Sequence, residues 1–110
     1  MKINIFRGDT KYYTFKIRKK SDQSLVNLDG GTLFFTAKNN TNDSDNDAVI
    51  SKVFATSGTS VTIFFSHDDT NVNPKTYPAD LQYVGAGGVP VITGKIELTI
   101  DKDVTQRITV

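Results

Sequence analysis

The segment 61–83 constrains the fold of this chain most strongly, because two strand patterns in it flank a single corner. In 61–66, and again in 77–83, apolar residues alternate with other residues. This period of two is typical of a strand with one buried face. Between the two patterns, Ser66 followed by Asp68 and Asp69 predicts an N-capped helical turn. The segment therefore predicts two core strands joined through a fixed turn.

The composition of the chain also favours sheets. Its 110 residues include seven Phe and four Tyr, with no Trp. Thr and Ser are abundant and Ala is scarce, a mixture that suits strands better than a helical bundle. The length fits a single domain with one core. Cys is absent, so neither a disulfide nor a thiolate metal site can form.

Charge and hydropathy argue against two classes of partner. The chain has 13 Lys and Arg against 12 Asp and Glu, and this near balance gives no general electrostatic attraction to nucleic acid or to an anionic membrane. No apolar run approaches the roughly 20 residues that span a bilayer. Residues 1–7 lack the apolar stretch of a signal peptide, and we expect synthesis in a cytoplasm.

The remaining strands follow from the same alternation, interrupted by turns rich in Gly, Asp and Asn. Lys52 shares the inner face of the fourth strand, which predicts an edge position. Gly94 interrupts the inner face of the last strand, which predicts a bulge or close sheet packing. Residues 1–100 form the predicted domain, and 101–110 form a polar tail or an extra strand. The expected strands lie at 3–6, 13–17, 32–38, 48–55, 61–66, 77–83 and 89–100.

Pro74 and Tyr77 mark a corner before the sixth strand. The segment Val72-Asn73-Pro74-Lys75-Thr76-Tyr77 resembles the tyrosine corner of immunoglobulin-like and fibronectin-type sandwiches, in which a Tyr hydroxyl bonds to upstream backbone. Together with the succession of short strands, this corner predicts an all-β fold. The expected architecture is a two-sheet antiparallel immunoglobulin-like or fibronectin-like sandwich of about seven strands.

Arg7-Gly8-Asp9 spells the tripeptide that many integrin ligands present. The same residues suit a β-turn between two strands, with Gly8 at positive φ and Asp9 capping the bend. Because turn chemistry explains all three residues, we interpret them as a structural turn without a receptor role.

The acidic loop 39–47 has the spacing of a calcium loop only at its start. Asp43, Asp45 and Asp47 alternate as the first three ligands would. The pattern then requires Gly where Ala48 stands and a bidentate acid where Phe54 stands. The sequence therefore favours a solvated loop and leaves weak calcium binding open.

His67 is the only histidine, and it lies between Ser66 and Asp68. Adjacent residues on a helical turn point in different directions, and no nucleophile-elbow motif accompanies them. The glycine-rich segment 85–88 lacks the Lys-Ser or Lys-Thr of a phosphate loop. We therefore predict a protein that is not an enzyme and that has no catalytic residues, no metal and no cofactor.

Four stretches combine turns and strands in a fixed order along the chain. They are Phe6-Arg7-Gly8-Asp9-Thr10 before 13–17, Val26-Asn27-Leu28-Asp29-Gly30 before 33–36, Asn73-Pro74-Lys75-Thr76-Tyr77 before 80–82, and Gly94-Lys95-Ile96-Glu97-Leu98 before Asp103-Val104-Thr105. Their order along nearly the whole chain resembles a family of small sandwich domains in tailed bacteriophages. The best-known member of that family is the N-terminal domain of the upper baseplate protein. The family's motifs mark no functional residues.

This resemblance implies a structural virion protein, a baseplate, tail or head-fibre attachment module that acts by protein–protein assembly. The implied partners are other phage structural proteins and further copies of the same chain. The implied location is the virion, assembled in the cytoplasm of the host bacterium. Within the tail, Val104, Ile108 and Val110 form a candidate assembly segment.

An immunoglobulin-like binding module, either an adhesin or a carbohydrate-binding domain, is the alternative. Carbohydrate binding usually requires an exposed aromatic platform. Tyr12 and Phe34 are predicted on outward faces, but nothing in the sequence clusters them and Trp is absent. The sequence therefore favours the virion interpretation.

Overall fold

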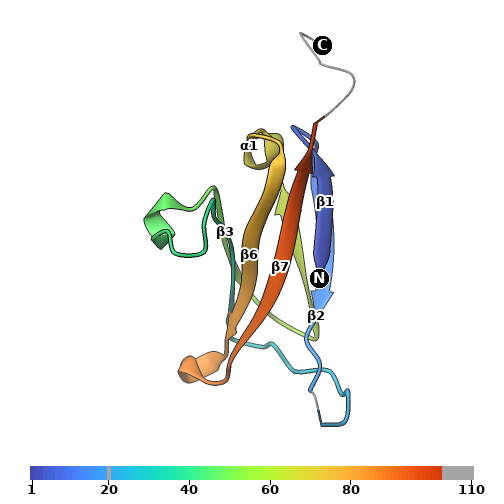
Figure 1. Ribbon diagram of the computed structural model, residues 1–110. Coiled ribbons are helices and arrows are strands. Elements are labelled where there is room, and N and C mark those ends of the chain that lie inside the picture. Colours follow the sequence, from blue (N-terminus) through green and yellow to red (C-terminus); the bar gives the residue numbers. More distant parts are fainter. Residues whose placement is uncertain (20, 103–110) are drawn as a thin grey trace.

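Two β-sheets form the protein in the computed structural model, which describes residues 1–19 and 21–102 (Figure 1). The strands are β1 (Lys2–Phe6), β2 (Lys11–Lys16), β3 (Thr32–Ala37), β4 (Ile50–Ala55), β5 (Ser60–Phe65), β6 (Lys75–Val84) and β7 (Val91–Asp101). The helical elements are the 3-10 turn η1 (Asp45–Asp47), the helical turn α1 (His67–Thr70) and the 3-10 turn η2 (Ala86–Gly88). The predicted all-β class and each expected strand are confirmed.

The larger sheet has the strand order β1-β7-β6-β3-β4, and the smaller sheet pairs β2 with β5. All these pairs are antiparallel except β1 with β7, which is parallel. The prediction of a purely antiparallel sandwich is therefore wrong at this edge. After β1 the chain turns and crosses to the other sheet, so β1 lies along β7 instead of forming a hairpin with β2. Apolar alternation has the same period in parallel and antiparallel strands, so it does not distinguish them.

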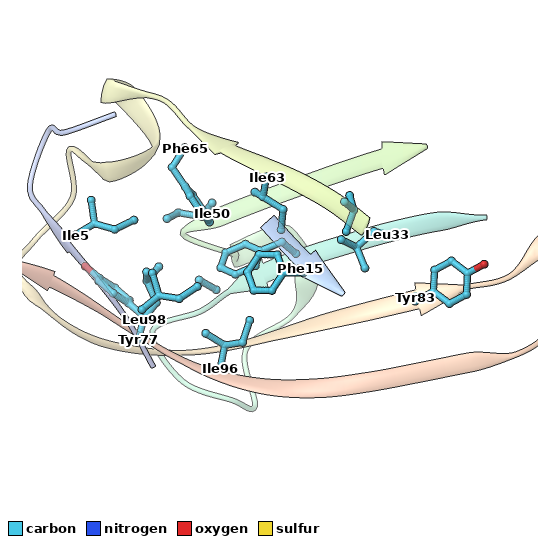
Figure 2. Close-up of a cluster of buried hydrophobic side chains, with 14 of the residues drawn as sticks. Ile5, Phe15, Leu33, Ile50, Ile63, Phe65, Tyr77, Tyr83, Ile96 and Leu98 are labelled. Atoms are coloured by element: carbon cyan, nitrogen blue, oxygen red, sulfur yellow. The ribbon is translucent and has the colours of Figure 1, made fainter. Parts of the chain in front are cut away.

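The inner faces of the two sheets enclose one apolar core (Figure 2). Strands of the larger sheet contribute most of the buried Ile and Leu side chains, and Phe15, Ile63 and Phe65 close the core from the smaller sheet. The rings of Phe35 and Phe65 meet edge to face with centroids 5.1 Å apart, a preferred arrangement of aromatic pairs. The core thus joins the two sheets directly.

The long β6–β7 hairpin corrects the prediction for Gly94. The register is continuous from Lys75 opposite Ile100 to Val84 opposite Val91, so Gly94 forms no bulge. A side chain at Gly94 would find no atom within 4 Å, so no other backbone approaches it closely. Gly94 is exposed, although Ile92 and Ile96 on the same strand contact the core.

Tyr77 closes the corner before β6, as predicted. Its side chain is 2% exposed, and its hydroxyl donates a hydrogen bond of 2.5 Å to the carbonyl of Asn73. Burial raises the pKa of the Tyr77 hydroxyl above its ordinary value. Pro74 lies between the two bonded residues, immediately before β6. The bond fixes the path by which the chain leaves α1 and enters the larger sheet.

Reciprocal hydrogen bonds cap α1. The Ser66 hydroxyl accepts from the Asp69 N–H at 3.2 Å, and the Asp69 carboxylate accepts from the Ser66 N–H at 2.8 Å. This is a capping box, which satisfies donors at the start of a helical turn. The capped turn predicted from the sequence is confirmed.

Candidate assembly surfaces

The Arg7-Gly8-Asp9 turn is held against α1. Gly8 has φ +82°, and the Asp9 N–H donates to the Phe6 carbonyl at 3.0 Å, as the predicted β-turn requires. The Gly8 N–H donates to the Thr70 carbonyl at 3.2 Å, and the Thr70 hydroxyl donates to the Asp9 carbonyl at 2.7 Å. The turn is therefore a structural joint between β1 and α1.

His67 completes this joint. Its Nδ1–H donates to the Gly8 carbonyl at 2.6 Å. A Cβ at Gly8 would lie 3.2 Å from the imidazole ring. The sequence predicted a capped turn and missed this contact, because no local pattern indicates that residues 8 and 67 meet. The imidazole therefore binds the Gly8 turn to α1 and does not form a triad with its sequence neighbours.

On its other side, α1 contacts β4 through an ion pair. The Lys52 Nζ lies 2.5 Å from the Asp69 Oδ2, and the two side chains are 23% and 21% exposed. Burial alone would raise the pKa of the Asp69 carboxyl, but hydrogen bonds from Lys52 and Ser66 hold this pKa below its ordinary value. β4 is an edge strand, as predicted. Its lysine is bound to α1, however, and does not stand free at the edge.

A lysine also organises the acidic loop. The Lys38 Nζ lies 2.8 Å from the Asp45 carboxylate and donates to the Asp43 carbonyl at 2.9 Å. The Asp47 carboxylate accepts from the Ser44 hydroxyl at 3.2 Å. Within residues 1–19 and 21–102, no group of three or more His, Cys, Asp or Glu residues is placed to hold a metal ion. The alternating aspartates therefore do not converge into a calcium site.

An aromatic pair lies on the outer face of the smaller sheet. Tyr12 and Phe64 are opposite each other in the β2–β5 register, and their ring centroids are 4.8 Å apart. Tyr12 is 69% exposed and Phe64 37% exposed. Beside them, the hydroxyls of Thr14 and Thr62 share a hydrogen bond of 2.9 Å. The expectation that nothing clusters Tyr12 is wrong, because its neighbour comes from a strand distant in the sequence.

The outer face of the larger sheet carries a second apolar pair. Phe34 and Val53 are opposite each other in the β3–β4 register and are 36% and 60% exposed. A shallow concavity of about 750 Å³ crosses the same face, with Phe34 in its lining together with both signs of charge, among them Lys95 and Glu97. Phe34 faces outward, as predicted.

The hydrogen-bond pattern of β4 identifies the groups at its free edge. The Thr56 N–H donates to the Gly31 carbonyl at 3.0 Å, and these residues are opposite each other when the β3–β4 register is extended by one position. Hydrogen-bonded and non-hydrogen-bonded pairs alternate along an antiparallel ladder. The even-numbered residues of β4 therefore bond to β3. The N–H and C=O groups of Ser51, Val53 and Ala55 point toward the free edge.

The opposite edge of this sheet, at β1, is partly covered. The Tyr13 hydroxyl, from the smaller sheet, donates to the Asn4 carbonyl at 3.4 Å. Lys2 at the start of β1 lies 3.9 Å from the Glu97 carboxylate. Of the two edges of the larger sheet, β4 therefore presents the more accessible backbone.

The candidate assembly segment Val104, Ile108 and Val110 lies outside the described residues. Among the residues that the structure describes, none of the helices is long and apolar enough to cross a membrane. No protein-family model matches the chain, and no curated protein matches it. The surfaces described above are therefore the basis for inferring a function.

Proposed function

We propose that this protein is a structural virion protein of a tailed bacteriophage, acting by protein–protein assembly in a baseplate, a tail or a head fibre. One observation carries the proposal: large apolar side chains are exposed in cross-strand pairs on both outer faces, Tyr12 with Phe64 and Phe34 with Val53. Exposed apolar clusters of this kind are typical of contact surfaces between proteins. The resemblance to the phage sandwich family supports the same function.

The proposed partners are other phage structural proteins and further copies of this chain. Such contacts need surface complementarity and no reactive group, so we assign no catalytic residue, cofactor, nucleic acid or membrane to this function. The proposed location is the virion, assembled in the bacterial cytoplasm.

We also propose that the fold belongs to the immunoglobulin-like or fibronectin-like sandwiches. The Tyr77 hydroxyl bonds to the Asn73 carbonyl in the manner of a tyrosine corner. In addition, β2 and β5 lie in one sheet, and β3, β6 and β7 lie in the other. This division of strands is the one that immunoglobulin-like domains use.

Mass spectrometry of purified particles tests the virion assignment. The chain should be present at a fixed copy number, and its absence from the particles would contradict the proposal. The double variant Tyr12→Ser, Phe64→Ser should reduce incorporation while the core stays folded, because both side chains lie on an outer face. Lys16→Ser, an exposed change in the same sheet, is the matched control.

Removing residues 103–110 tests the candidate assembly segment separately. The shortened chain should fold, because β7 ends at Asp101, and it should fail to enter particles. Incorporation at normal copy number would show that the segment is not the attachment element.

A carbohydrate-binding module is the second candidate function, and the Tyr12–Phe64 pair favours it. The two rings are tilted by 37° and lie beside the Thr14 and Thr62 hydroxyls. Such a surface offers both stacking and hydrogen bonds to a sugar. A glycan array with the wild-type chain and with Tyr12→Ala tests it, and Phe34→Ala on the opposite sheet is the control. Binding that only Tyr12→Ala abolishes would support this second function.

A further inference from the structure

We infer that β4 is a self-association edge, at which β4 of one copy pairs antiparallel with β4 of a second copy of the chain. The two larger sheets would then form one continuous sheet across a two-fold axis. This inference rests on the proposed assembly function and names a partner and a surface for it.

The backbone of β4 has the groups that such pairing needs. Ser51, Val53 and Ala55 turn their N–H and C=O groups to the free edge, since the residues between them bond to β3. β4 contains no proline, which would remove a donor from the edge. An edge of this kind accepts another strand through main-chain hydrogen bonds.

The register of the pairing follows from these three residues. In a two-fold antiparallel pair, the outward-pointing residues of both strands must be opposite each other. All three residues find partners when Val53 lies opposite Val53 of the second copy. Ser51 then lies opposite Ala55 of the second copy, and Ala55 opposite its Ser51. Shifting the register to the next allowed position leaves some of these groups without a partner.

The side chains of β4 are compatible with this register. On the outer face, Phe34 and Val53 are cross-strand neighbours, so the paired edge would extend the apolar pair into a stripe shared by both copies. Lys52 is the one charged residue in β4, and it is bound to Asp69. No like charges therefore face each other across the axis. This absence of like-charge repulsion argues for a second copy as the partner. The order Ser51, Val53, Ala55 argues for it too, because antiparallel pairing with a second copy places small residues opposite small ones and Val53 opposite Val53.

Disulfide trapping tests the register directly, because the chain contains no Cys. In Val53→Cys, the only possible disulfide joins two copies. Hydrogen-bonded antiparallel pairs have Cα atoms about 5.5 Å apart, within the range of about 4.4–6.8 Å that a disulfide accepts. We expect rapid formation of a covalent dimer under mild oxidation. Val91→Cys is the control, because Val91 is similarly exposed, at 55% against 60% for Val53, but lies in β7.

Charge variants at the same position test the association without a covalent bond. Sedimentation of the wild-type chain should show a monomer–dimer equilibrium that depends on concentration. Val53→Asp and Val53→Lys should each raise the dimer Kd by up to about fivefold, because like charges then meet on the axis. An equal mixture of the two variants should restore the dimer. Circular dichroism should show both variants folded, since Val53 is exposed in the single chain.

Three results would overturn the inference: a wild-type chain that stays monomeric at millimolar concentration, equal trapping rates for Val53→Cys and Val91→Cys, or dimerisation unchanged by either charge variant. The first result, combined with incorporation of the chain into particles, would reject the β4 pairing and leave the virion function standing. A dimer through β4, in a chain that purified particles lack, would reject the virion function instead.

Discussion

α1 is joined to the two sides of the larger sheet by different kinds of contact. Toward β1, three hydrogen bonds connect α1 with the Arg7-Gly8-Asp9 turn, and each of them uses a backbone carbonyl. Toward β4, the described contact is the ion pair between Lys52 and Asp69. The β1 edge is also partly covered by the Tyr13 hydroxyl, whereas β4 has open backbone groups.

We call the β1 edge, with the Arg7-Gly8-Asp9 turn, the closed side of the sandwich. The β4 edge, with Lys52, is the open side. On the β1 side, the contacts are made by a tight turn whose conformation only a glycine adopts easily. On the β4 side, the contact depends on two charges, so salt and acid weaken it. The closed side should therefore control folding stability, and the open side should respond to solution conditions and to partners.

Gly8→Val should have the largest effect, because it disrupts the turn that holds β1 against α1 on the closed side. Valine is costly at positive φ, and its Cβ would lie 3.2 Å from the His67 ring. We expect a loss of about 1–3 kcal/mol in the free energy of unfolding, measured by urea denaturation. Gly94→Val is the matched control, since no atom lies within 4 Å of a Cβ there. Equal stability of Gly8→Val and wild type would show that the turn is not a structural joint.

Tyr77→Phe should have a smaller effect. It measures the contribution of one buried hydrogen bond to backbone, made by a residue of β6, which is not an edge strand of the larger sheet. Losing the bond to the Asn73 carbonyl should cost about 1 kcal/mol at neutral pH. Because the folded pKa of Tyr77 is raised above 10.0, its contribution is complete below that pH and is lost as pH rises through the folded pKa. The stability gap between wild type and variant should therefore narrow in alkali. A gap that is absent at neutral pH would contradict the role of the corner.

Lys52→Met tests the open side, with an expected loss of at most about 1 kcal/mol for a partly exposed pair. The folded pKa of Asp69 lies below 3.8, so its contribution is present above that pH and is lost as pH falls through the folded pKa. Denaturation at a series of pH values should show the difference between wild type and variant shrinking in acid. Added salt should shrink it at neutral pH as well. If the stability difference between wild type and Lys52→Met changed with neither pH nor salt, packing and not charge would join β4 to α1.

The parts of the structure that the sequence predicted correctly depend on neighbours in the chain. The strands, the capped turn at Ser66 and the corner at Tyr77 each follow from a local period or spacing. The parts that it missed depend on residues far apart in the sequence. The parallel β1–β7 pair, the contact of His67 with Gly8 and the contact of the Tyr12 ring with the Phe64 ring are of this kind. A single sequence gives each residue's preferences but does not identify its distant partner.

Gly94 shows a different reason for a wrong prediction. A glycine inside a strand often marks a bulge or a close backbone approach. Here the β6–β7 register is continuous and the site is open. The free edge of β4 was also not predicted in detail. Its outward-pointing backbone groups follow from the hydrogen-bond pattern of the sheet and not from the composition of the strand.

Asp9→Glu should have the smallest effect and tests whether the closed side has a receptor role. The Asp9 carbonyl accepts from the Thr70 hydroxyl, and its N–H donates to the Phe6 carbonyl, so these two contacts belong to backbone groups that the change retains. We expect the free energy of unfolding to change by less than about 0.5 kcal/mol, and particle assembly and host attachment to be unaffected. An integrin-type receptor would reject the longer side chain. If attachment were lost while denaturation and circular dichroism stayed at wild-type values, the Arg7-Gly8-Asp9 turn would be a recognition site, and the closed side would carry a function in addition to stability.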